Sequence, residues 1–121
     1  MKLNATQKSG FTLVEIMIVV AIIGLLAAIA IPNFVKARTT AQKNTCIANL
    51  KQIEGAVEQW ALENKKAPTA NVTTGDIIGT DKFIKTDVRC PAGTDSPYVL
   101  STVAVRPTCP NVASVTDHVL P

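Results

Sequence analysis

The sequence has few aromatic residues and a single histidine. Of its 121 residues only 4% are aromatic, with one Trp, one Tyr and three Phe. It contains no Gly-rich phosphate loop, no G-x-S-x-G motif and no cluster of carboxylates that resembles an active site. A chain of this length also buries too little surface to enclose a large catalytic cleft. We therefore expect no enzyme activity, no cofactor and no metal in the function.

The chain also has only a small excess of one charge over the other. Lys and Arg number 12 and Asp and Glu number 9, which gives a formal net charge of +3. Lys2 and Lys8 belong to the first ten residues, so the remainder is nearly neutral. The pair Lys65-Lys66 is the only basic cluster beyond them, which disfavours DNA as a partner. A basic stripe created by assembly of several copies stays open as an alternative.

A long apolar run lies close to the N-terminus. It extends from Phe11 to Ile31, and Glu15 is its only ionisable residue. A helix of about 20 apolar residues spans a bilayer. A secretory signal peptide would need a small-residue cleavage site, and Ala28-Ile29-Ala30 is a poor one because Ile31 follows. A plain membrane anchor leaves Glu15 unexplained, since a carboxylate within the membrane costs about 2.5–3.5 kcal/mol and calls for a partner.

The residues around the start of this run carry a specific motif. The segment Ser9–Glu15 reads SGFTLVE, and Gly24 and Pro32 follow in the apolar run. It resembles the cleavage and methylation signature of type IV prepilins and type II secretion pseudopilins. The resemblance implies that a prepilin peptidase cuts after Gly10 and N-methylates the new terminal residue, Phe11.

The resemblance also implies a role for Glu15. In this family the carboxylate pairs with the terminal ammonium of the neighbouring subunit, here that of Phe11, and sets the register of a helical filament. The alternative is that Glu15 only stabilises the N-terminus of its own helix through the helix dipole. The partners implied are other copies of the chain, the prepilin peptidase, the lipid bilayer, and an inner-membrane assembly platform with its ATPase.

The helical pattern continues beyond the apolar run. Apolar residues recur at three and four positions, which predicts an amphipathic helix: Ile47, Leu50, Ile53, Val57 and Trp60. Lys65-Lys66 and Pro68 predict its end, and Gly24 and Pro32 predict a kink or local unwinding within it. The expected parts are a leader (1–10), a transmembrane and assembly helix (11–35), its amphipathic second half (36–66) and a small head (67–121).

The head is rich in Thr, Asn, Gly, Asp and Pro. A short helix is expected near Thr73 or Thr74, with Asp76 in its first turn, and Phe83-Ile84 should pack against the long helix. Short strands are predicted at three segments: 98–100, 103–106 and 118–120. The predicted fold is α+β and pilin-like, with a long N-terminal helix that carries a small antiparallel sheet.

Three cysteines, Cys46, Cys90 and Cys109, allow three single pairings. On the implied topology the head lies outside the cytoplasm, where a disulfide can form and persist. Cys90–Cys109 is the favoured pair because both cysteines lie in the predicted sheet region and close a short loop, and Cys46 is then a buried free thiol. A zinc site from the three cysteines and His118 has suitable ligand types, but it is disfavoured because no C-x-x-C pair is present.

Calcium is a further metal to consider, because major pseudopilins often bind it in an acidic C-terminal loop. In this sequence only Asp95 and Asp117 lie near such a place, so no calcium site is predicted.

The expected function is that of a structural subunit of a type IV pilus-like filament, polymerised from the inner membrane. A type II secretion pseudopilin, which acts as a subunit of a piston-like pseudopilus, is the alternative within the family. A single-pass anchored binding module that never polymerises is the alternative from another class. The chain should first lie in the inner membrane and then in a periplasmic or cell-surface filament.

Overall fold

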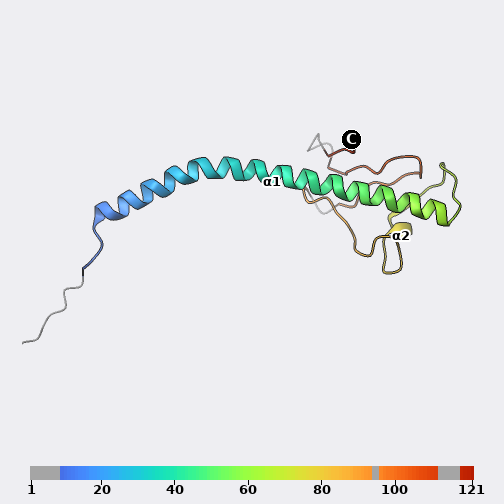
Figure 1. The fold of residues 1–121 in the computed structure, drawn as a ribbon, viewed down its shortest axis with the longest axis horizontal. Coiled ribbons are helices and arrows are strands. Elements are labelled where there is room, and N and C mark those ends of the chain that lie inside the picture. Colours follow the sequence, from blue (N-terminus) through green and yellow to red (C-terminus); the bar gives the residue numbers. More distant parts are fainter. Residues whose placement is uncertain (1–8, 94–95, 112–117) are drawn as a thin grey trace, which may run out of the picture. The chain divides into compact units, whose positions relative to one another are not determined.

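The computed structural model describes residues 9–93, 96–111 and 118–121. Their regular elements are two helices, α1 (Leu13–Glu63) and α2 (Thr74–Ile77), both labelled in Figure 1. The chain divides into two compact units, of which the first ends at Ala37 and the second begins at Arg38. The predicted leader lies outside the described residues except for Ser9 and Gly10.

Helix α1 begins with a capping box. The backbone N–H of Glu15 donates to Thr12 Oγ1 at 3.2 Å, and the backbone N–H of Thr12 donates to Glu15 Oε2 at 3.4 Å. Thr12 precedes the first helical residue, and Glu15 is the third residue of the helix, which is the spacing that a capping box requires. The prepilin-like motif therefore also contains the start signal of the helix.

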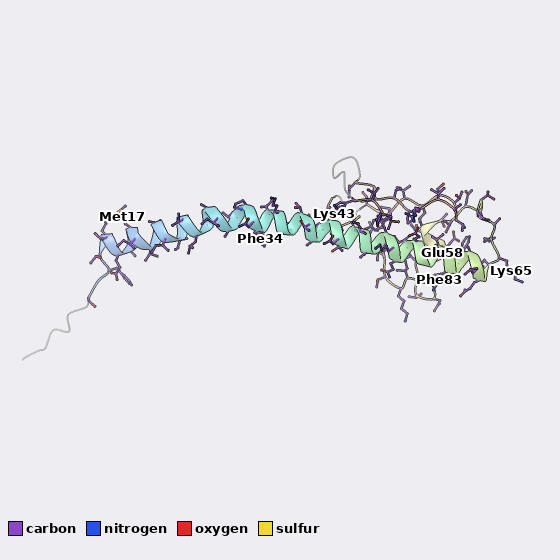
Figure 2. The ribbon with its side chains drawn as sticks, turned by 45° about the horizontal axis from the view of Figure 1, so that its top comes forward. Met17, Phe34, Lys43, Glu58, Lys65 and Phe83 are labelled. Carbon is purple, nitrogen blue, oxygen red and sulfur yellow. The ribbon has the colours of Figure 1, made fainter. Side chains whose placement is uncertain are left out.

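The first unit holds the apolar part of α1. Its large apolar side chains are exposed, including Met17 and Phe34, which stand out from the ribbon in Figure 2. Length and composition allow α1 to cross a membrane, and none of its most apolar window is buried. The helical assignment is unbroken at Gly24 and Pro32, so the structure has no local unwinding there. A kink at these residues stays a prediction.

The second unit is built around the later part of α1. Its buried helical residues lie on one face: Cys46, Leu50, Ile53, Ala56, Val57, Trp60 and Ala61. This confirms the predicted apolar stripe as intramolecular core. Val72, Ile77, Ile84 and Tyr98 complete that core, and Phe83 packs against it. In Figure 1 the segments that follow α1 run beside its green part.

The predicted antiparallel sheet is not found among the described residues. These residues form only isolated bridges: Asn71 with Thr102, Ile78 with Ile84, Arg89 with Pro97, and Val99 with Thr108. Val99 and Thr108 exchange two backbone hydrogen bonds, of 3.0 and 3.1 Å, and the next hydrogen-bonded pair on one side would be Pro97 with Pro110. Proline has no N–H to donate to a ladder, so the pairing cannot extend in that direction. The α+β class is thus confirmed only in its helical part.

Helix α2 is placed as the sequence predicts. Thr73 precedes it, and Asp76 lies in its first turn. The backbone N–H and the hydroxyl of Thr73 both donate to Asp76 Oδ2, at 2.8 and 2.6 Å. These bonds hold the pKa of Asp76 below its usual value. Ile77, at the end of the helix, is fully buried in the core.

The C-terminal end of α1 is strained. The N–H of Lys66 donates to the Ala61 carbonyl at 2.9 Å, and the N–H of Lys65 donates to the Leu62 carbonyl at 3.3 Å. This pair of bonds is a Schellman motif, and Lys65 takes its left-handed position with φ 49°. Glycine normally occupies that position because a Cβ atom is disfavoured there.

We predict that Lys65→Gly stabilises the second unit by about 1 kcal/mol, because it removes this backbone strain. Trp60 is the only tryptophan and lies in the core one turn earlier, so its fluorescence during thermal unfolding measures the effect. Lys66→Gly is the matched control. It removes the same charge without relieving a positive φ, and it loses the Lys66 Nζ contact 5.9 Å from the Trp60 ring centre. The control should lower the melting temperature, and equal shifts from both changes would contradict the strain argument.

Candidate functional site

The residues of the predicted cleavage site lie before α1. Ser9, Gly10 and Phe11 precede the helix and have no regular secondary structure, and together with Glu15 they line a shallow open hollow. Phe11 is 84% exposed. A Cβ atom built on Gly10 would meet nothing within 4 Å. The fold of this chain therefore does not require glycine at position 10, and a requirement for it must come from a molecule that binds here.

Glu15 is exposed on the first turn of α1. Its carboxylate accepts the long hydrogen bond from Thr12 that closes the capping box. The helix-stabilising role considered from the sequence is thus present in the structure. An exposed carboxylate with a bond of 3.4 Å can still accept a stronger, charge-assisted bond from a cation.

A second group of reactive side chains lies in the second unit. Cys46 projects from α1, while Cys90, Cys109 and His118 come from the irregular segments that follow. Their ligand-type atoms all lie within 4.8 Å of one another, and all four residues are buried. Cys90 Sγ is 3.7 Å from His118 Nδ1. The structure thus gathers four side chains that are separated by up to 72 positions in the sequence.

All three cysteines lie in the described part of the chain, and there they are free thiols. Cys46 is completely buried, as predicted. The Cys90–Cys109 disulfide is not present in this structure and stays a prediction. Asp95 and Asp117, considered for calcium, lie outside the described residues.

The thiols of this cluster differ in acidity. Burial raises the pKa of Cys46 to about 12 and also raises the pKa of Cys109. Burial acts in the same direction on Cys90, but hydrogen bonds outweigh it and lower its pKa to about 6. The donors are the Ala92 backbone N–H, the Asn111 side chain and groups of the cluster itself. Cys90 is therefore the cysteine that ionises first.

Polar side chains of α1 support the cluster. Asn49 Nδ2 donates to the Arg89 carbonyl and to the Tyr98 hydroxyl, each at 3.1 Å. The Tyr98 hydroxyl in turn donates to Cys46 Sγ at 3.5 Å. Sequence patterns alone did not identify Asn49, because a polar residue beside an apolar stripe has no distinguishing signal.

Comparisons with known proteins confirm the N-terminal resemblance. Residues 6–31 match the family model described as the prokaryotic N-terminal methylation motif. The chain is similar to "Type II secretion system core protein G" of Escherichia coli (strain K12), with 39% identity over 57% of this chain and 48% of that protein. It is also similar to "Type IV major pilin protein PilA" of Myxococcus xanthus (strain DK1622), with 49% identity over 50% of this chain and 27% of that protein.

A "Fimbrial protein" of Neisseria meningitidis serogroup A is 38% identical over 65% of this chain and 46% of that protein. The chain thus spans less than half the length of each of these relatives. No solved structure matches the chain significantly. The similarity includes both pilins and secretion proteins, so it does not separate the two.

We predict that Asn49→Ala destabilises the second unit by about 1–2 kcal/mol, because it removes two hydrogen bonds, one exposed to the Arg89 carbonyl and one partly buried to the Tyr98 hydroxyl. Gln42→Ala is the matched control. It removes one exposed bond of 3.0 Å from α1 to the Pro91 carbonyl and should cost less than half as much. Unfolding followed by Trp60 fluorescence measures the free energy of unfolding of both variants. An equal loss of stability in Asn49→Ala and Gln42→Ala would contradict the larger role assigned to Asn49.

Proposed function

We propose that this protein is a structural subunit of a type IV pilus-like filament, with no catalytic role. The observation that carries the proposal is the combination of the methylation motif with an apolar helix whose most apolar window is not buried by any of the described residues. A prepilin peptidase would cleave after Gly10 and methylate the new amino terminus of Phe11. The mature chain would then begin directly at the apolar helix.

The exposed apolar surface supports assembly. From Phe11 to Val35 the large apolar side chains are about half exposed or more, with Val19 the least exposed at 48%. Such a surface is stable only in lipid or against other apolar surfaces. In the inner membrane the bilayer would cover it before assembly, and neighbouring copies of the same helix would cover it in a filament.

Glu15 would fix the axial position of neighbouring subunits, which apolar contact alone does not fix. Hydrophobic packing is non-directional, so a bundle of such helices could slide along its axis. An ion pair between Glu15 and the methylated ammonium of Phe11 in the neighbouring subunit would fix that register. The pair would be formed in a low dielectric, where an unpaired charge is costly.

The remaining parts of the proposal follow from the family resemblance. An inner-membrane assembly platform and its ATPase would extract the subunit from the bilayer, with the head outside the cytoplasm. Within the family, a type II secretion pseudopilin acting as a piston-like subunit is the alternative, and the similarity to core protein G favours keeping it. A membrane-anchored binding module that never polymerises is the competitor from another class.

Mass spectrometry of the intact mature protein tests processing. We expect loss of Met1–Gly10 and addition of one methyl group.

Gly10→Val should accumulate the unprocessed precursor, because a branched side chain must enter the peptidase cleft beside the scissile bond. Gly24→Ala is the control, since its Cβ also meets nothing within 4 Å of this chain and lies away from the cut. Mature protein at the normal level from the Gly10 variant would show that the cleavage site is elsewhere.

Glu15→Ala tests assembly. We expect normal processing and membrane insertion but no filaments by electron microscopy, because the ammonium of the incoming subunit finds no partner. Thr12→Ala is the matched control: it removes the hydroxyl of the capping box and keeps the carboxylate. That change weakens the helix start by about 1 kcal/mol and should leave filaments in place. Equal loss of filaments in both variants would reduce Glu15 to a capping residue.

A further inference from the structure

The four buried side chains Cys46, Cys90, Cys109 and His118 have the composition of a complete metal-ligand set. We propose that they bind one zinc ion, which fastens the segments after α1 to the helix. Three thiolates and one imidazole form a standard ligand set of structural zinc sites. This proposal reverses the expectation from the sequence, in which the lack of a C-x-x-C pair argued against zinc.

The distances are close to those of a tetrahedral site. Zn–S bonds of about 2.3 Å and Zn–N bonds of about 2.0–2.1 Å place neighbouring ligand atoms about 3.5–3.8 Å apart. Cys90 Sγ and His118 Nδ1 already lie 3.7 Å apart, and no pair among the four exceeds 4.8 Å. Side-chain rotations that move the ligand atoms by about 1 Å would bring the longer distances to those of a tetrahedral site.

The backbone around two of the ligands is arranged to receive thiolates. Cys90 and Cys109 each precede a proline, in the sequences Cys90-Pro91-Ala92 and Cys109-Pro110-Asn111. In both, the backbone N–H two residues after the cysteine donates to its sulfur. The chain thus forms the same Cys-Pro-X turn twice. Such N–H···S bonds stabilise a metal-bound thiolate and orient it.

His118 gives an independent reason. It is only 1% exposed, and it is the only buried residue among the described ones that is classed as polar. A buried imidazole needs a polar partner, because its transfer out of water is costly otherwise. The polar contact that the structure gives it is the 3.7 Å approach to Cys90 Sγ, and thiols are weak hydrogen-bond partners. A zinc ion bound to both His118 Nδ1 and Cys90 Sγ would give the buried imidazole a strong polar partner.

A cross-link between α1 and the segments after it would also stabilise the second unit. The second unit has a small apolar core, and its described residues form only isolated bridges where a sheet was expected. A zinc ion would join α1 to three points of the irregular chain at once. Small domains with little core commonly use a structural metal or disulfides in this way. The Cys90–Cys109 disulfide would use two of the four ligands, so zinc binding and that disulfide exclude each other.

The test uses the full-length protein, extracted from membranes in detergent without chelator. Elemental analysis should give about one zinc per chain. Three thiols should resist alkylation until a chelator and denaturant are added. Exchange with Co²⁺ should give the visible absorption of a tetrahedral thiolate site. A Cys90–Cys109-linked peptide with one free thiol, or three reactive thiols without metal, would overturn the proposal.

Variants identify the ligands. His118→Ala should weaken zinc binding by more than about tenfold, and His118→Cys should retain it because a fourth thiolate can replace the imidazole. Ile53→Val is the packing control: it trims the same core one turn beyond Leu50 and should keep the full zinc content. If His118→Ala keeps stoichiometric zinc, or if His118→Cys binds no better than His118→Ala, this ligand set is wrong. Should His118→Ala fail to fold, the Co²⁺ spectra of the wild type and of His118→Cys still decide.

Discussion

The exposed apolar surface of the first part of α1 is the constraint on which the rest of the molecule depends. A helix with apolar side chains on all sides cannot be covered by an irregular chain of this length, so it must be covered by lipid or by other copies. The capping box at Thr12 and Glu15 gives such a helix a defined beginning. It also places the only carboxylate of the apolar run on the first turn, next to the residue that processing would turn into the amino terminus. On the proposed function, membrane insertion, cleavage and register would therefore depend on residues that lie within a few positions of one another.

In the second unit, the later part of the same helix forms one side of an apolar core. Here α1 presents one apolar face, and the segments that follow contribute single large residues to it, such as Ile77, Ile84 and Tyr98. Backbone pairing adds little, because the described residues form only isolated bridges. Stability must then come from side chains that cross between α1 and the irregular segments. The Asn49 bonds, the Glu54–Arg106 ion pair at 3.0 Å and the buried cysteine and histidine cluster all do so.

The sequence predicts the helical part of this fold well and the rest poorly, for physical reasons. Helical periodicity is a local signal, so the stripe from Leu50 to Trp60 and the end of α1 near Lys65 can be read directly. The capping residues of α2 are equally local. Strand pairing depends on which distant segments meet, and apolar triplets such as residues 98–100 do not reveal that Pro97 and Pro110 would face each other in the next hydrogen-bonded pair. The gathering of Cys46, Cys90, Cys109 and His118 is likewise non-local, and without a C-x-x-C pair no short motif in the sequence indicates that these four residues meet. The repeated Cys-Pro-X turn was the available signal.

The two functional regions are expected to act independently because they belong to different compact units of the chain. Glu15 and Phe11 lie in the first unit, and the four proposed zinc ligands lie in the second. Residues that share no partner usually contribute additively to stability. If both proposals hold, a subunit without zinc should still insert into the membrane and be processed, since lipid and the peptidase would act on the apolar helix and the residues before it. Conversely, a change at Glu15 should leave the zinc cluster intact. In the proposed filament, this separation would let the core use one type of contact for every subunit, while the second unit is held together by interactions within a single chain.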